Sequence, residues 1–77
     1  MDNQELAKAL GDVVRKRRTK LGFSQEAFAD EVGVHRTNQG LIENCLRYVT
    51  LVDLFRHAAA PGIQPSQLLR EVGKRLG

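Results

Sequence analysis

A run of positive charge near the start of the chain is the first feature that could do chemistry. Arg15, Lys16, Arg17, Arg18 and Lys20 place five cations within six residues. Such a run is typical of a patch that binds nucleic-acid phosphates or of a solvated helix face. The chain has 12 Lys and Arg against 9 Asp and Glu, a net charge of +3, so the distribution of charge is more informative than its sum. Taken alone, the run favours the solvated face.

Nucleophiles and metal ligands are few. The chain has one cysteine, Cys45, and two histidines, His35 and His57. A Cys–His enzyme needs a nucleophile, a base and an orienting group, and a cysteine-based zinc site needs several thiolates. One cysteine excludes an internal disulfide and is consistent with a reducing compartment. We therefore expect no enzyme activity, no cofactor and no metal, and we interpret His57 as an ordinary helix residue.

Length and composition predict one small soluble domain over residues 1–77. Hydrophobic residues make up 42% of the chain and charged residues 27%, which is typical of a packed globular protein. A chain this short buries only about 60–65% of its unfolded surface, so its stability is marginal unless it is compactly helical or oligomeric. No apolar run approaches the roughly 18 residues of a membrane span, and the acidic start does not resemble a signal peptide. We expect a cytoplasmic protein that does not associate with membranes.

Apolar residues recur at helical spacing throughout, so the predicted fold is all-α, with five short helices and no strand. Capping residues and prolines mark the ends of the helices. The expected helices run from about 3 to 20, from 25 to 32, from 35 or 36 to about 45, from 51 to about 60, and from 65 to 76. Gly33 fits a left-handed C-cap after the second helix, where a Cβ would cost about 1 kcal/mol or more. Val34 then closes a sharp turn between the second and third helices.

Several segments between Leu10 and about Leu69 carry a family resemblance. They are LGDVVRKRRTKLGFSQEAFADEVGVHRT, IE, RYVTL and GIQPSQLL. Together they resemble the lambda-repressor-like, Xre-type helix-turn-helix family, and the ungapped spacing from VHRT to RYVTL is similar to that of restriction-modification controller proteins. The resemblance covers roughly four fifths of the chain. It implies a compact five-helix bundle in which the second and third helices form the helix-turn-helix, with double-stranded DNA as the partner.

A helix of about 10–12 Å diameter fits the major groove of B-DNA, so exposed side chains near its start can reach base edges. The resemblance implies base contacts at Arg36 and Thr37, and the adjoining positions Gly40 and Leu41 are added to this face. Arg36 would donate to guanine O6 and N7, and Thr37 would meet a base, a phosphate or the thymine methyl group. A groove contact is assigned to Arg47. The expected phosphate contacts are Ser24, Gln25, His35 and Asn44. All of these positions are also compatible with ordinary surface residues.

Two further positions are expected to shape the third helix from inside. The resemblance implies that Arg18 and Glu43 form a structural ion pair that sets the orientation of this helix. Gln39 stands where the family usually has a buried aliphatic residue, and we expect its amide to turn to the rim or to a backbone group. Cys45 and Tyr48 also depart from the family pattern, so the end of the third helix is expected to rotate or lengthen.

A single short helix reads few base pairs, so a homodimer on a pseudo-palindrome is expected. The resemblance places the dimer interface on the C-terminal helices, at Leu68, Leu69, Val72 and Leu76. The hypothesis that these residues favour is a transcriptional regulator that acts by occupying its operator, blocking or recruiting polymerase. Two alternatives stay open: an antitoxin-like protein whose main partner is a toxin, and an interaction module that has lost DNA recognition.

Overall fold

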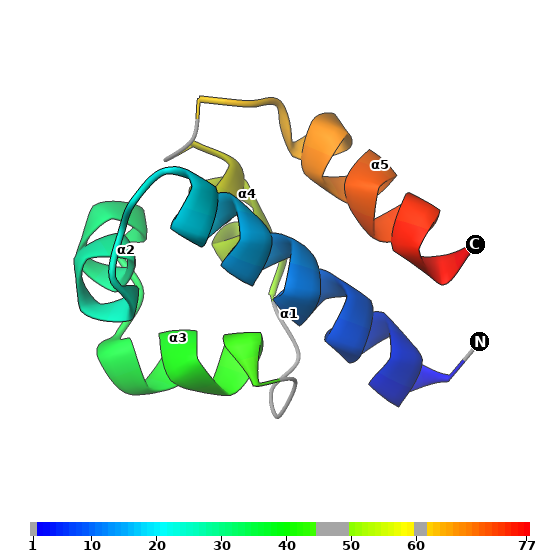
Figure 1. The fold of residues 1–77 in the computed structure, drawn as a ribbon, viewed down its shortest axis with the longest axis horizontal. Coiled ribbons are helices and arrows are strands. Elements are labelled where there is room, and N and C mark those ends of the chain that lie inside the picture. Colours follow the sequence, from blue (N-terminus) through cyan, green and yellow to red (C-terminus); the bar gives the residue numbers. More distant parts are fainter. Residues whose placement is uncertain (1, 45–49, 60–61) are drawn as a thin grey trace.

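The computed structural model describes residues 2–44, 50–59 and 62–77. Within them lie five α-helices and no strand, so the predicted all-α fold is confirmed. The helices are α1 (Asn3–Lys20), α2 (Gln25–Val32), α3 (Arg36–Glu43), α4 (Leu51–Ala59) and α5 (Pro65–Leu76). Figure 1 shows α1 crossing the molecule, with α5 along one flank and with α2 and α3 away from the end where both termini lie. α1 packs against α3 and α5, and α4 packs against α2 and α5.

Short-range hydrogen bonds define where the helices begin. Asp2 Oδ1 accepts from the Glu5 N–H at 2.7 Å, and Ser24 Oγ accepts from the Ala27 N–H at 3.1 Å. Such caps satisfy helix N–H groups that have no partner within the helix. The predicted starts of α1 and α2 are therefore confirmed. α3 ends at Glu43 with Asn44 as its C-cap, two residues before the predicted end at Cys45, which lies outside the described residues.

The turn between α2 and α3 has the predicted geometry. Gly33 adopts φ 76° and ψ 29°, a left-handed conformation that costs residues with a Cβ about 1 kcal/mol or more. The Val34 N–H returns to the Ala29 carbonyl at 2.9 Å, and the Val34 side chain is buried. Arg56 on α4 donates to the Gly33 carbonyl at 2.8 Å. The turn is thus closed from within and clamped from α4.

The core consists of two apolar clusters on either side of α1. The first joins α1, α4 and α5 and contains Ala9, Val13, Ala58, Leu68 and Val72. The second joins α1, α2, the turn and α3 and contains Val14, Phe28, Val32, Val34 and Ile42. Leu10 packs against both, so α1 is the shared wall.

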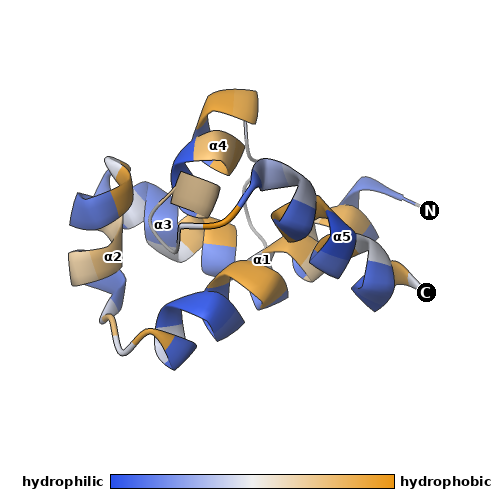
Figure 2. Cartoon of the chain, turned by 90° about the horizontal axis from the view of Figure 1, so that it is seen from above, coloured by the Kyte–Doolittle hydropathy of each residue, from blue (hydrophilic) through white to orange (hydrophobic). Residues whose placement is uncertain are grey.

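Burial corrects the predicted dimer surface. Leu68 is 1% exposed and Val72 is 5% exposed, because both project from α5 onto α1 and α4. The side chains of Leu68 and Val72 therefore belong to the core and are not available for a partner subunit. Leu69 and Leu76 remain exposed, and Leu76 lines a pocket between α1 and α5. Figure 2 also shows hydrophobic residues of α4 at the outer edge of the molecule.

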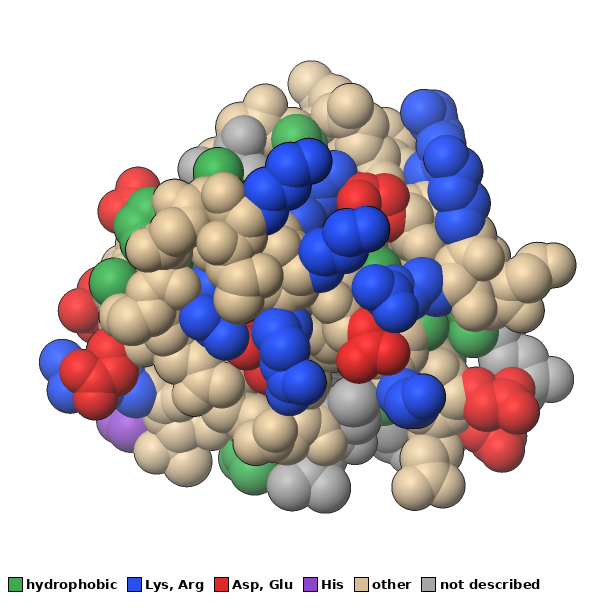
Figure 3. All heavy atoms as spheres, in the orientation of Figure 1, with side chains coloured by type: hydrophobic (Ala, Val, Ile, Leu, Met, Phe, Trp, Pro, Cys, Tyr) green, Lys and Arg blue, Asp and Glu red, His purple; other side chains and the backbone are tan. Residues whose placement is uncertain are grey.

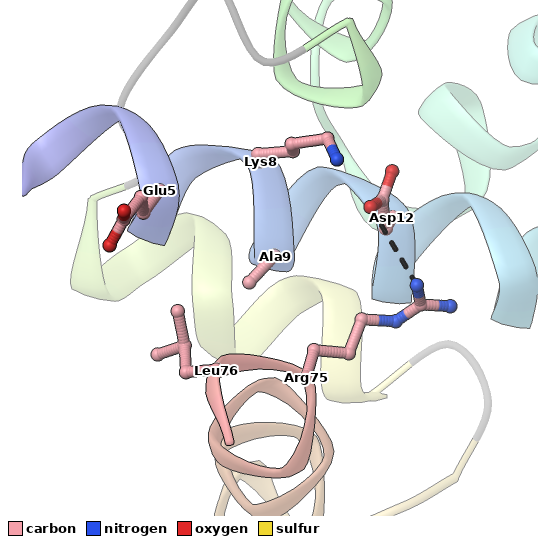
Figure 4. A pocket seen from close by; sticks show the side chains of 6 residues that line it. All are labelled: Glu5, Lys8, Ala9, Asp12, Arg75 and Leu76. Carbon is pink, nitrogen blue, oxygen red and sulfur yellow. Dashed lines mark ion pairs between the residues drawn. The ribbon is translucent and has the colours of Figure 1, made fainter. Parts of the chain in front are cut away.

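Charged side chains tie α5 to α1. Arg17 on α1 pairs with Glu71 on α5, and Arg75 Nη1 lies 3.6 Å from Asp12 Oδ2. Figure 4 shows the second pair at the side of a pocket between the two helices, where Lys8 and Glu5 also lie. Ion pairs between partly exposed side chains near the surface contribute little each, about 0–1 kcal/mol. Their role here is to orient α5 on α1. No helix in the described part of the chain is long and apolar enough to span a membrane.

Candidate nucleic-acid interface

The outward face of α3 carries most of the residues predicted to contact bases. Arg36 and Thr37 are exposed in its first turn, and Gly40 and Leu41 are half-buried one turn later. α3 lies at an edge of the molecule (Figure 1), and its exposed side chains are in its first turn. Arg47, the remaining predicted groove contact, lies outside the described residues.

Arg36 has a partner in the free protein that the sequence did not reveal. Its Nη1 lies 3.5 Å from Glu26 Oε2 in α2, and the two side chains are 60% and 68% exposed. A pair this exposed is weak, because water screens the charges. Arg36 can therefore leave Glu26 for a guanine at small cost. The signal for this pair was the acidic first turn of α2, which the turn brings beside the start of α3.

His35 caps α3 through its ring. His35 Nδ1 accepts from the Thr37 N–H at 3.2 Å, which requires the ring hydrogen to be on Nε2. The exposed Nε2–H is left as a donor beside the start of the helix, where free N–H groups and the helix dipole attract anions. The predicted phosphate role of His35 remains compatible with its role as a cap.

The other predicted phosphate contacts have internal partners. Ser24 Oγ is engaged in capping α2, and Gln25 Nε2 donates to Glu43 Oε1 at 3.3 Å. An amide nitrogen carries two hydrogens, so Gln25 keeps a second one for an anion. Asn44 is exposed, and its Oδ1 accepts from Arg15 Nη2 at 3.2 Å.

The predicted ion pair between Arg18 and Glu43 is present and buried. Arg18 Nε donates to Glu43 Oε2 at 2.9 Å and Arg18 Nη2 to Oε1 at 2.9 Å, so the guanidinium holds the carboxylate with two nitrogens. Glu43 has no exposed side-chain surface. Burial alone raises the pKa of Glu43, but hydrogen bonds from Arg18, Gln39 and Gln25 outweigh it and hold this pKa below its usual value. α3 is thereby locked to α1 by a charge that stays ionised.

Two other cations of the basic run are also structural, although the sequence taken alone favoured a solvated helix face for this run. Arg15 Nη2 donates to the Glu43 carbonyl at 2.8 Å and so caps the C-terminal end of α3. Arg17 pairs with Glu71. Lys16 and Lys20 remain as exposed cations of this run. Figure 3 shows the face of the molecule seen in Figure 1, where Lys and Arg side chains lie across the middle and alternate with acidic side chains rather than forming a uniform basic patch.

Comparison with known proteins places the chain in a family. No protein-family profile matches it. It is 38% identical over 65 residues to the control protein C.MunI from Mycoplasma sp. The aligned residues make up 83% of this chain and 88% of that protein. This chain belongs to the controller proteins of the Xre-type helix-turn-helix family.

Two solved structures have the same fold as this controller-family chain. The restriction-modification controller protein C.AhdI from Aeromonas hydrophila superposes with a TM-score of 0.76 at 35% identity, over 80% of this chain and 94% of that one. The hypothetical transcription factor NHTF from Neisseria superposes with a TM-score of 0.81 at 33% identity, over 99% and 87%. The predicted lambda-repressor-like bundle is therefore confirmed over nearly the whole chain.

The sequence suggested that the Gln39 amide turns to the rim or to a backbone group, and the structure of this controller-family protein corrects that expectation. Gln39 is 0% exposed, and its Nε2 donates to Glu43 Oε2 at 2.8 Å. Its Oε1 lies 2.8 Å from Nε2 of His57, which is itself buried in α4. Glu43, one turn later on the same helix, and His57 from α4 thus contact the two ends of the amide, and His57 is not an ordinary helix residue. The sequence signal was a polar residue at an aliphatic position, and it did not point to His57 as the partner.

The predicted site residues therefore separate into two layers. Arg36, Thr37 and His35 are exposed around the start of α3, whereas Arg18 and Glu43 hold the helix from beneath. In the described part of the chain, no group of three His, Cys, Asp or Glu side chains is placed to hold a metal ion. The arrangement offers hydrogen-bond donors on a helix surface.

Proposed function

We propose that this protein is a sequence-specific DNA-binding transcriptional regulator that places α3 in the major groove and acts as a homodimer on a pseudo-palindromic operator. The observation that carries the proposal is the division of α3 into two faces. Its inner face is committed to the core and to the Arg18–Glu43 pair, and its outer face presents Arg36 and Thr37 without a structural task beyond one weak ion pair. A helix held this firmly can present donors to base edges in one orientation.

The surroundings of α3 favour contact with a phosphate backbone. The exposed Nε2 of His35 and the second amide hydrogen of Gln25 supply donors that carry no base information. Lys16 and Lys20 add exposed positive charge elsewhere, on α1. Such contacts position a protein on the duplex while base contacts select the sequence. The descriptions of the relatives as control proteins and a transcription factor support the same role.

An apolar surface on α4 and α5 supports the homodimer. Leu51, Val52 and Phe55 on α4 and Leu69 on α5 are all more than half exposed. Leu51 and Leu69 line one groove together with Leu6, Leu10, Thr50, Leu54 and Val72. Large apolar side chains gathered in this way on a small protein mark an interaction site. A second copy of the chain would cover this surface and bring two α3 helices to half-sites about 34–36 Å apart.

Introducing a charge at Phe55 tests the dimer. Phe55→Asp should weaken self-association by about 2 kcal/mol or more, roughly thirty-fold, because it places a carboxylate in a desolvated interface. Leu21→Asp is the matched control, since Leu21 is 47% exposed but lies at the end of α1. Sedimentation equilibrium across a concentration series measures both variants. A parent chain that stays monomeric at micromolar concentration and binds DNA as a monomer would defeat the dimer.

The proposed function is tested by selection from random duplexes. Purified protein is equilibrated with the pool at about 50 and 200 mM salt, and the retained DNA is sequenced. We expect enrichment of an inverted repeat and an affinity that falls steeply with salt, because binding releases counterions from phosphates. Retention without enrichment, or no retention, would overturn sequence-specific recognition and favour a protein partner at the α4–α5 surface.

A further inference from the structure

The buried chain of polar groups between α4 and α1 contains one more acceptor than a neutral histidine can serve. This series of hydrogen-bonded groups runs from the Asp53 carbonyl through His57, Gln39 and Glu43 to Arg18. His57 Nδ1 lies 2.6 Å from the Asp53 oxygen, and His57 Nε2 lies 2.8 Å from Gln39 Oε1. Gln39 Nε2 is committed to Glu43 Oε2 at 2.8 Å. Both ring nitrogens of His57 therefore face oxygen acceptors.

Counting donors shows what this arrangement requires. A backbone carbonyl only accepts, and a Gln amide supplies one donor end and one acceptor end. Glu43 is an ionised acceptor, because Arg18 grips both of its oxygens. With acceptors at both ends and Gln39 in the middle, every contact is a hydrogen bond only if His57 donates from Nδ1 and from Nε2. That species is the imidazolium.

Each neutral form leaves one contact between two lone pairs. With hydrogen on Nδ1 alone, the bare Nε2 faces Gln39 Oε1. Turning the Gln39 amide over repairs that contact but sets its carbonyl oxygen against the Glu43 carboxylate. With hydrogen on Nε2 alone, the bare Nδ1 faces the Asp53 carbonyl at 2.6 Å. A mismatch inside a buried site is costly, because no water is present to replace the lost partner.

We propose that His57 and Gln39 are positioning residues for α3, and that a proton taken up by His57 completes the hydrogen-bonded chain that holds this helix in its DNA-reading orientation. The proposal rests on the proposed function and adds its regulation by protons. Loss of that proton leaves Gln39 in conflict either with His57 or with Glu43. The strain falls on α3, because Gln39 and Glu43 are its two buried polar residues.

The charges around His57 set the range in which this exchange takes place. From α4 itself comes Asp53, from α3 comes Glu43, and behind Glu43 stand Arg18 and Arg15 of α1. α2 contributes the Phe28 ring, whose centroid is 5.8 Å from that of the imidazole. Burial lowers the pKa of His57, while the hydrogen bond to the Asp53 carbonyl and the two carboxylates oppose that shift. The proton is therefore taken up on the acid side of neutrality, below the pH at which an exposed histidine titrates.

The first test observes His57 without DNA. His35→Asn removes the only other imidazole and keeps a good N-cap for α3. In this variant, nitrogen NMR of the folded protein across about pH 5.5 to 8 reports the ring hydrogens directly. We expect hydrogen on both nitrogens at the acid end, and a Gln39 side-chain amide signal that shifts with the same midpoint. A His57 ring that keeps one hydrogen throughout, or a Gln39 amide that ignores the titration, would overturn the proposal.

The second test measures DNA binding, on a duplex enriched from the random pool. In the His35→Asn background, the pH dependence of Kd is compared with that of a chain also carrying Gln39→Leu and His57→Leu. Each pKa unit by which DNA raises the pKa of His57 gives a tenfold gain in affinity toward acid, and we expect about tenfold, absent from the leucine pair. Equal pH dependence in both proteins would refute the link between His57 and α3.

The direction of these effects separates positioning from a purely structural role. Because the pKa of His57 is lower in the folded than in the unfolded chain, the unfolded chain binds more protons between the two values. The free energy of unfolding therefore falls as pH falls through that interval. DNA affinity is expected to rise over the same interval. If no duplex is selected at any pH, the proposed function fails, and the NMR titration still decides the state of His57.

Discussion

Replacing Glu43 by alanine is expected to lower the free energy of unfolding by about 3–5 kcal/mol, the typical cost of removing one partner from a buried ion pair. The reason is that the Arg18 guanidinium, 13% exposed, would keep its charge without the carboxylate that neutralises it. Gln39 would lose an acceptor as well. A domain of this size has a total stability of about 4–12 kcal/mol, so the variant should lose at least about a quarter of it.

Urea and thermal unfolding followed by circular dichroism measure this loss. Glu31→Ala is the matched control, because Glu31 is an exposed acid in the neighbouring helix α2 and its removal should change stability by no more than about 0.5 kcal/mol. If Glu43→Ala unfolds at the same urea concentration as Glu31→Ala, the ion pair does not hold α3.

The same carboxylate predicts the acid behaviour of the fold. The pKa of Glu43 is lowered in the folded protein, so its contribution is present above the unfolded value near 4.5 and is lost as pH falls through the folded value. This acid-side loss of stability should be smaller in Glu43→Ala than in the parent chain.

Replacing Arg36 by alanine should weaken binding to the selected operator by about 1–3 kcal/mol per half-site while leaving stability unchanged. The guanidinium is exposed, and its only described partner in the free protein is Glu26, at 3.5 Å. Both subunits of a dimer would lose the contact, so the effect on a full operator should be roughly doubled. Preference at one base pair of each half-site should relax, because a bidentate contact to guanine specifies that pair.

Fluorescence anisotropy with the operator and with single-base variants of it resolves this change in specificity. Lys20→Ala is the control, since Lys20 is an exposed cation on α1 rather than on the outer face of α3. That variant should weaken all duplexes about equally and reduce the salt dependence of binding. An Arg36→Ala protein that behaves in the same way would assign Arg36 to the phosphate backbone and not to a base.

The sequence alone determined the helices and the turn. Asp2, Ser24, Gly33 and Pro65 act through contacts within a few residues of themselves, so their effect can be read from the order of residues. The ion pair of Arg18 and Glu43 was predicted for a different reason, because the resemblance to the helix-turn-helix family implies this contact between two distant helices. Arg36 and Thr37 were placed on the outer face of α3 by the same resemblance and by helical periodicity.

Only the tertiary structure decided which side chains meet across helices. Leu68 and Leu69 are adjacent and chemically identical, yet one is in the core and the other is exposed, because the packing of α5 on α1 and α4 selects one face. Gln39 and His57 are 18 residues apart, and neither signals the other in the sequence. A buried polar residue is tolerated only where its hydrogen-bonding partners converge, and that convergence depends on the whole fold rather than on local sequence.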